Sequence, residues 1–161
     1  MRHCQRGLMA RGLVVFVVCL GVLVVAPRAG SAQASSVSVS GSPAALQILG
    51  AAGGAGGVPA PAVDAATTYT VKVQNKAVKK ITVQLSSNMP PGVTLTISLA
   101  PPIGASSVPV SLSTTVTDAV TNITNKQAQT LAITYTLNAT VAAGVVGSQS
   151  RTVTFTLINF P

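Results

Sequence analysis

Four lysines between residues 72 and 80 form the densest group of charge in the sequence: Lys72, Lys76, Lys79 and Lys80. Clustered ammonium groups attract anions, so one interpretation is a contact with phosphate or with an acidic polysaccharide of the cell envelope. The other interpretation is structural, because lysines blunt an exposed strand edge and keep a charge-poor protein soluble. The sequence favours the structural interpretation and leaves both open.

The remaining side chains offer little for catalysis. General acid-base chemistry, nucleophile activation and most metal sites use His, Cys, Glu or Asp. After residue 34 the chain has no histidine, cysteine or glutamate, and its acidic residues are Asp64 and Asp118. A Ser-Lys pair and a calcium site at the two aspartates stay open, although single loop aspartates more often form turns. We therefore expect no enzyme, no cofactor and no metal site.

The N-terminal segment has the pattern of an export signal. Three arginines within the first eleven residues precede an apolar run from Leu13 to Ala26, which is shorter than the roughly 20 residues that a membrane span needs. Ala32-Gln33-Ala34 supplies the small residues of a cleavage site. We expect a cleavable signal peptide over residues 1–34 and no permanent membrane span. The protein is then periplasmic, on the cell surface or extracellular.

The chain after the signal is long enough for one domain and has a modest net charge. Its 127 residues carry six basic and two acidic side chains, which gives a net charge of +4, and only four aromatic residues. Nucleic-acid sites usually combine denser basic patches with stacking aromatics, so we expect no nucleic-acid partner. Both cysteines, Cys4 and Cys19, lie in the signal, and the rest of the chain has none for a disulfide.

Alternation of apolar and polar residues predicts the fold. Successive strand side chains point to opposite faces, so such runs give sheets with one dry face and one wet face. Five runs show this period: 69–73, 81–85, 93–99, 131–137 and 153–157. Proline- and glycine-rich turns separate most of them. The pattern predicts an all-β, antiparallel, immunoglobulin-like sandwich of about 7–8 strands.

The expected organisation is an N-terminal strand region over 35–49, a Gly/Pro/Ala-rich loop over 50–66 and a sandwich body over 67–161. The apolar residues between Val116 and Ile123 have a helix-like spacing, but the threonines among them fit an irregular strand equally well. Pro109 predicts that its segment is an edge strand.

Three stretches carry a family resemblance: "KKITVQLSSNMPPGVTLTISLAPP", "VSLSTTVTDAVTNI" and "LNATVAAGVVGSQSRTVTFTLI". Through them the body from about Tyr69 onward resembles small exported bacterial immunoglobulin-like proteins and, more distantly, fimbrial major subunits and spore-coat U type domains. The last stretch looks like that family's closing pair of strands. The resemblance implies a structural protein of the cell surface or extracellular matrix, such as a pilus or coat subunit. Its partners would be other copies of itself or other surface subunits.

Subunits of fimbrial type can donate an N-terminal strand to a neighbour. The segment with the required alternation is Ser36, Val37, Ser38, Val39 and Ser40. The alternative is that this strand pairs within its own sandwich, and the presence of a final strand at 151–158 favours this self-completion. A second functional hypothesis is a monomeric, envelope-associated binding module that takes a glycan or an anionic ligand at the lysines.

Overall fold

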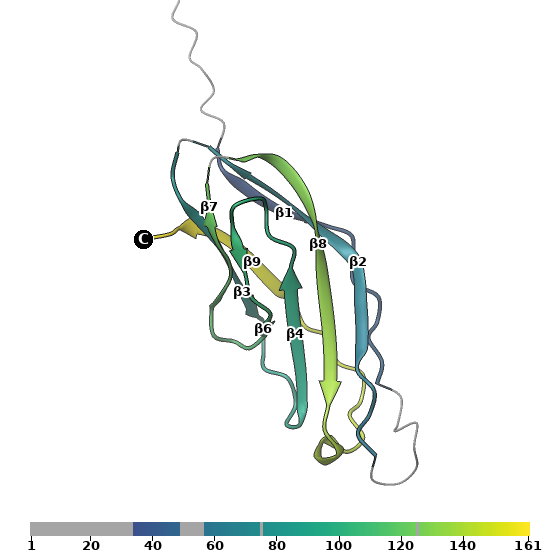
Figure 1. The fold of residues 1–161 in the computed structure, drawn as a ribbon. Coiled ribbons are helices and arrows are strands. Elements are labelled where there is room, and N and C mark those ends of the chain that lie inside the picture. The colour runs from purple at the N-terminus through teal and green to yellow at the C-terminus, as the bar shows by residue number, and fades with distance from the viewer. Residues whose placement is uncertain (1–33, 49–56, 75, 125) are drawn as a thin grey trace, which may run out of the picture. The chain divides into compact units, whose positions relative to one another are not determined.

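The computed structural model describes residues 34–48, 57–74, 76–124 and 126–161. Over these residues the chain forms nine strands and one short 3-10 helix (Figure 1). The predicted signal peptide lies outside the described residues except for Ala34. No helix in the described part is long and apolar enough to cross a membrane.

The strands form two antiparallel sheets. One has five strands in the order β1-β2-β8-β4-β6, and the other has four in the order β5-β7-β3-β9. The strand bounds are β1 Ser36–Ser40, β2 Ala62–Val73, β3 Lys79–Leu85, β4 Val93–Leu99, β5 Ser106–Ser107, β6 Val110–Ser111, β7 Thr117–Ile123, β8 Lys126–Ala139 and β9 Val153–Asn159. The all-β sandwich that the alternation predicted is confirmed.

From β3 onward, each strand lies in the opposite sheet from the strand before it. The sheet order differs from the A-B-E-D and C-F-G order of immunoglobulin constant domains, because β3 lies between β7 and β9. Such alternation also occurs in jelly-roll sandwiches. The last stretch of the family resemblance suggested that the chain closes with a pair of strands. In the structure its two strands, β8 and β9, lie in different sheets and do not pair with each other.

The core lies between the sheets and contains one parity of each long strand. In β3 the buried side chains Ile81, Val83 and Leu85 alternate with Lys80 and Gln84. The same rule selects the other fully buried aliphatics and Tyr69 in β2, β4 and β8. The side chains of β1 and β9 that face the core are only partly buried, so the core is densest toward the middle of both sheets.

β7 is a strand, which decides against the helical interpretation of 116–123. Its pairing with β3 contains register shifts, and Asn122 has a left-handed backbone with φ of 60°. A bulge places two neighbours on the same face. Ala119 and Val120 are accordingly both buried, and this break in the period of two produced the helix-like spacing.

Two further boundaries follow from local chemistry. β2 begins at Ala62, so residues 62–66 of the predicted loop belong to a strand, and residues 49–56 lie outside the described residues. Pro109 separates β5 from β6, each of two residues and each at a sheet edge, as the proline predicted.

Candidate functional site

The structure divides the four lysines between two faces of the sandwich. Lys72 lies in β2 between the buried Val71 and Val73, so it points to the outer face of the five-stranded sheet. Lys80 is the second residue of β3 and precedes the buried Ile81, so it points to the outer face of the four-stranded sheet. Because β2 and β3 belong to opposite sheets, these two lysines do not form one continuous patch.

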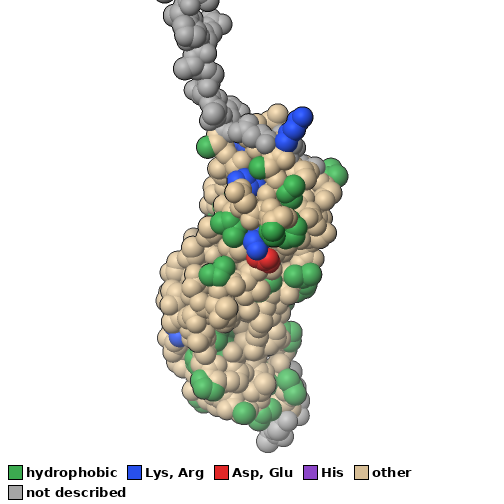
Figure 2. Space-filling model, turned by 90° about the vertical axis from the view of Figure 1, so that its left-hand side faces the viewer, with side chains coloured by type: hydrophobic (Ala, Val, Ile, Leu, Met, Phe, Trp, Pro, Cys, Tyr) green, Lys and Arg blue, Asp and Glu red, His purple; other side chains and the backbone are tan. Residues whose placement is uncertain are grey.

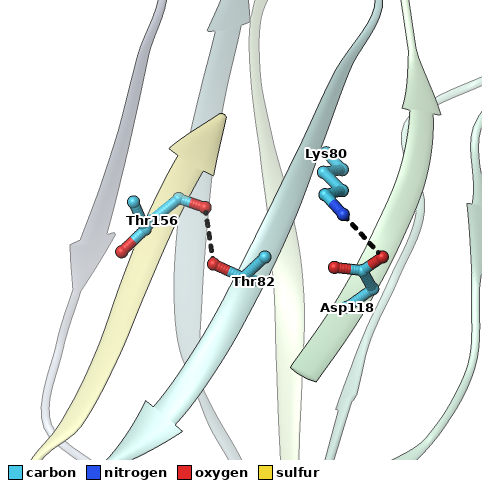
Figure 3. A network of polar contacts seen from close by, with 4 residues as sticks. All are labelled: Lys80, Thr82, Asp118 and Thr156. Carbon is cyan, nitrogen blue, oxygen red and sulfur yellow. Dashed lines mark hydrogen bonds and ion pairs between the residues drawn. The ribbon is translucent and has the colours of Figure 1, made fainter. Parts of the chain in front are cut away.

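Lys80 forms an ion pair across the four-stranded sheet. Its Nζ lies 2.9 Å from Oδ2 of Asp118 on β7, and the two side chains are 20 % and 42 % exposed (Figure 3). The same ammonium lies 5.9 Å from the centre of the Phe160 ring. An ion pair this open contributes about 0–1 kcal/mol, so it fixes the alignment of β3 and β7 more than it stabilises the fold.

The other two lysines lie where the chain passes from one sheet to the other. Lys79 is the first residue of β3 and donates from Nζ to Oδ1 of Asn159 on β9, at 2.5 Å. Lys76 is exposed in the connection before β3 and has a left-handed φ of 52°. The alternating run predicted from the sequence, 81–85, leaves Lys79 outside the strand, but β3 includes it.

The strands that carry the lysines are not sheet edges, and the expected effect of the lysines on solubility stays a prediction. β2 lies between β1 and β8, and β3 lies between β7 and β9, so both strands are interior. The edges are β1 and β6 in one sheet and β5 and β9 in the other. The lysines gather at one end of the sandwich, where Lys79 contacts the edge strand β9 at its last residue, Asn159. Sequence reasoning missed the partner of Lys80, although Asp118 is one of only two acids after residue 34.

The two aspartates lie in different sheets, Asp64 in β2 and Asp118 in β7. Asp64 is buried and accepts long hydrogen bonds from the backbone N–H groups of Ala44 and Ala66, at 3.4 and 3.3 Å. It thereby ties the segment after β1 to the bulge in β2. In the described part of the chain, no group of three or more His, Cys, Asp or Glu residues could hold a metal ion.

Two buried tyrosines have perturbed acidity. Burial raises the pKa of Tyr69 to about 12, and its hydroxyl donates to the carbonyl oxygen of Ala100 at 2.5 Å. Burial also raises the pKa of Tyr135, with a further contribution from the negative charge of Asp64. Both phenols stay protonated near neutral pH, so they act as core side chains with polar tips rather than as bases.

A groove of about 730 Å³ opens at the end of the sandwich opposite the lysines, where β3 ends and β4 begins. Its lining includes Leu46, Met89, Leu137 and Val141 and contains no charged side chain. The groove also adjoins Ile48 and Gly57, on either side of residues that the structure does not describe. Its chemistry suits apolar contacts and does not match an anionic ligand.

β1 is a short edge strand with little buried surface. It pairs with β2 alone, in the register Ser36↔Lys72 to Ser40↔Thr68, and four of its five residues are exposed. Only Val37 packs against the core. A further bond from the Gln74 N–H to the Ser35 hydroxyl, 3.0 Å, holds its start. The predicted donation segment is thus a strand paired within its own sandwich.

The face shown in Figure 2 has few charged side chains, and basic groups lie mainly toward the upper end of that view. Uncharged surface separates them, so this face shows no dense basic patch. Comparison of the chain with protein-family models, with curated proteins and with solved structures finds no match. Function therefore has to be inferred from the chain's own residues.

Proposed function

We propose that this protein is an exported, non-enzymatic structural protein of the cell surface or extracellular matrix, and that its copies join by exchanging β1. The observation that carries the proposal is the loose attachment of β1, which pairs with one strand and adds one partly buried side chain to the core. The resemblance to fimbrial and spore-coat subunits supports the same class of function.

Exchange of β1 between identical copies replaces each lost contact with the same contact from a neighbour. Domain swapping of this kind has a low free-energy cost because the paired residues do not change. Residues 41–61 connect β1 to β2, and 21 residues span up to about 70 Å when extended. A β1 that leaves its own sandwich on this connection can reach a neighbouring copy. If each copy both donates and accepts, the result is an open chain of subunits.

A pair of cysteines tests the exchange. In a Cys4→Ser, Cys19→Ser background, we expect Ser38→Cys with Thr70→Cys to form a disulfide, because these residues are opposite each other in the β1–β2 register. Exchanged copies then give a ladder of covalent multimers on a non-reducing denaturing gel. A self-complete protein gives only internally linked monomers, and this result would refute the proposal.

The matched control links β2 to β8, which are both interior strands. Thr70 and Thr130 are opposite each other, and their hydroxyl oxygens lie 2.9 Å apart. The double variant Thr70→Cys with Thr130→Cys should yield monomers only. Negative-stain microscopy of the same samples shows whether multimers are filaments. A monomer that binds heparin in a salt-sensitive way would instead support the binding-module hypothesis.

A further inference from the structure

β9 is the longest edge strand of the described part of the chain, and it has the features of a strand that accepts a partner. Its seven residues pair with β3 without a register shift, whereas β2–β8 and β3–β7 both contain irregularities. It has no charged residue and no proline. Proteins usually protect an edge with one of these devices, or by keeping it short.

The other described edges are shorter. β5 and β6 have two residues each and lie on either side of Pro109. β1 has five residues, four of them exposed, and three of the five are serines. β9 instead has the sequence VTFTLIN, with the β-branched and aromatic residues that favour strand pairing.

Hydrogen bonds at both ends of β9 show which backbone groups face outward. The Phe160 N–H donates to the Val78 carbonyl at 2.9 Å, and the Ser86 N–H donates to the Thr152 carbonyl at 2.9 Å. In an antiparallel pair, bonded residues alternate with unbonded ones. The even-numbered residues of β9 therefore bond to β3, and the N–H and C=O groups of Val153, Phe155, Leu157 and Asn159 point away from the sheet.

This parity makes the edge self-complementary. When two β9 strands run antiparallel about a two-fold axis at Thr156, Val153 lies opposite Asn159 of the second copy and Phe155 lies opposite Leu157. All four are outward-bonding residues, so each pair can exchange two backbone hydrogen bonds. Thr156 lies opposite its own copy as an unbonded pair. This register pairs all seven residues of β9 with the same seven residues of the second copy, and a two-fold contact uses the same surface on both copies.

Charge favours the antiparallel arrangement. The basic end of the sandwich adjoins the C-terminal end of β9, where Lys79 bonds to Asn159. In the two-fold register Asn159 is six residues from its copy, which separates the two basic ends by about 20 Å along the strand. That distance exceeds the screening length of about 8 Å at physiological ionic strength, so repulsion between the copies is weak.

We infer that two copies of this chain join through their β9 edges, which makes one continuous eight-stranded sheet from two four-stranded sheets. β1 approaches β9 from the other sheet. The contact uses the outward backbone groups of β9 alone, so it does not rest on the exchange of β1. The two contacts also differ in outcome, since β9 pairing closes at a dimer whereas β1 exchange gives a chain of any length.

A single cysteine at the two-fold axis tests the register. In the full chain with Cys4→Ser and Cys19→Ser, we expect Thr156→Cys to form a covalent dimer under mild oxidation. Opposite Cα atoms of an unbonded pair lie about 4.5 Å apart, within the range of a disulfide. Thr154 is equally an exposed residue of β9, but in this register it lies about 13 Å from its copy. Thr154→Cys should crosslink roughly ten-fold more slowly, since this separation is too long for a disulfide.

A charge at the axis provides the second test. Thr156→Lys places two ammonium groups directly opposite each other, which destabilises the contact. We expect Thr156→Lys to lower the sedimenting mass at least about two-fold relative to the wild type, because each β9 contact joins two copies. The control Thr94→Lys, on the exposed face of β4 in the other sheet, should keep the wild-type mass. Circular dichroism checks that each variant is folded.

Three results would overturn the inference. They are equal crosslinking rates for Thr154→Cys and Thr156→Cys, a ladder rather than a single dimer band from Thr156→Cys, and a sedimenting mass that is the same for Thr156→Lys and the wild type. The disulfide test of β1 exchange uses residues of the other sheet, so it can succeed or fail independently of these results.

Discussion

At the scale of single residues, the polar atoms of the core determine how stability depends on conditions. Tyr69 is fully buried, and its hydroxyl is bonded to the carbonyl of Ala100. Thr67 is fully buried as well, but its hydroxyl finds no hydrogen-bond partner among the described residues. The Tyr69 hydroxyl can donate its hydrogen bond only while it remains protonated. The Thr67 hydroxyl lowers the stability of the fold, because it is buried without a partner.

Alkaline pH should destabilise the protein through Tyr69. Its pKa is about 12 in the folded state and about 10 when unfolded, so the folded state holds the proton more tightly. The resulting stability is complete below pH 10 and falls as pH rises from 10 to 12, by about 2–3 kcal/mol in total. Urea unfolding between pH 9 and 12 measures this loss.

Tyr69→Phe serves as the reference variant for this measurement. It has no phenol to ionise, so its unfolding free energy should decline less steeply with pH, and the remaining slope belongs to Tyr135. At neutral pH it should be less stable by about 1–3 kcal/mol, because the Ala100 carbonyl loses its donor. Equal pH slopes in the two proteins would contradict the assignment.

Thr67→Val should raise stability. Valine has nearly the same shape and removes a buried hydroxyl without a partner, which should add about 1 kcal/mol to the free energy of unfolding. The control is Thr68→Val, at the next and less buried position, which should change stability by less than about 0.5 kcal/mol. A loss of stability in Thr67→Val would show that the hydroxyl is bonded in solution.

At the scale of elements, close backbone packing fixes the turn before β4. Gly92 has a φ of 77°, and its carbonyl accepts the Thr140 N–H at 2.8 Å. A Cβ atom there would lie 2.8 Å from the backbone nitrogen of Ala143, in the 3-10 helix at Val141–Ala143. The glycine therefore lets the end of β8 and the start of β4 approach each other.

Gly92→Ala should separate backbone strain from this contact when it is compared with Gly104→Ala. Gly104 has a similar φ of 82°, but a Cβ atom there meets nothing within 4 Å. We expect Gly104→Ala to cost about 1–2 kcal/mol from the left-handed backbone alone. Gly92→Ala should cost at least about 1 kcal/mol more, because backbone must move. Thermal unfolding of both variants measures the difference, and equal losses would exclude the packing effect.

Sequence periodicity predicted the long strands well and their pairing poorly. β3, β4 and β9 follow an unbroken alternation, because each buries one face on the same core. β7 was ambiguous since its bulge shifts the parity at Ala119 and Val120. The edge role expected of the lysines failed at the same step. Whether Lys79 and Lys80 protect an edge depends on the neighbours of β3, which one sequence does not specify.

At the scale of the whole molecule, the main pairings join distant parts of the chain. β2 and β4 both pair with β8, and β3 pairs with β9 over residues 79–85 and 153–159. Topologies dominated by non-local pairs fold slowly because loop closure must precede the contacts.

We expect refolding in milliseconds to seconds or longer, rather than in microseconds. Stopped-flow dilution from urea, followed by the fluorescence of the two tyrosines, measures the rate. Refolding within microseconds would mean that local structure forms first, contrary to the strand order. Tyr69→Phe retains Tyr135 as a probe and checks that both regions report the same event.

The alternation of strands between the sheets also bears on biogenesis. Neither β2 nor β3 has its full set of neighbours until the last quarter of the chain has been synthesised. Until then neither sheet is complete in the growing polypeptide. Under the export proposed above, a chain in this state can still pass through a narrow translocation channel before it folds.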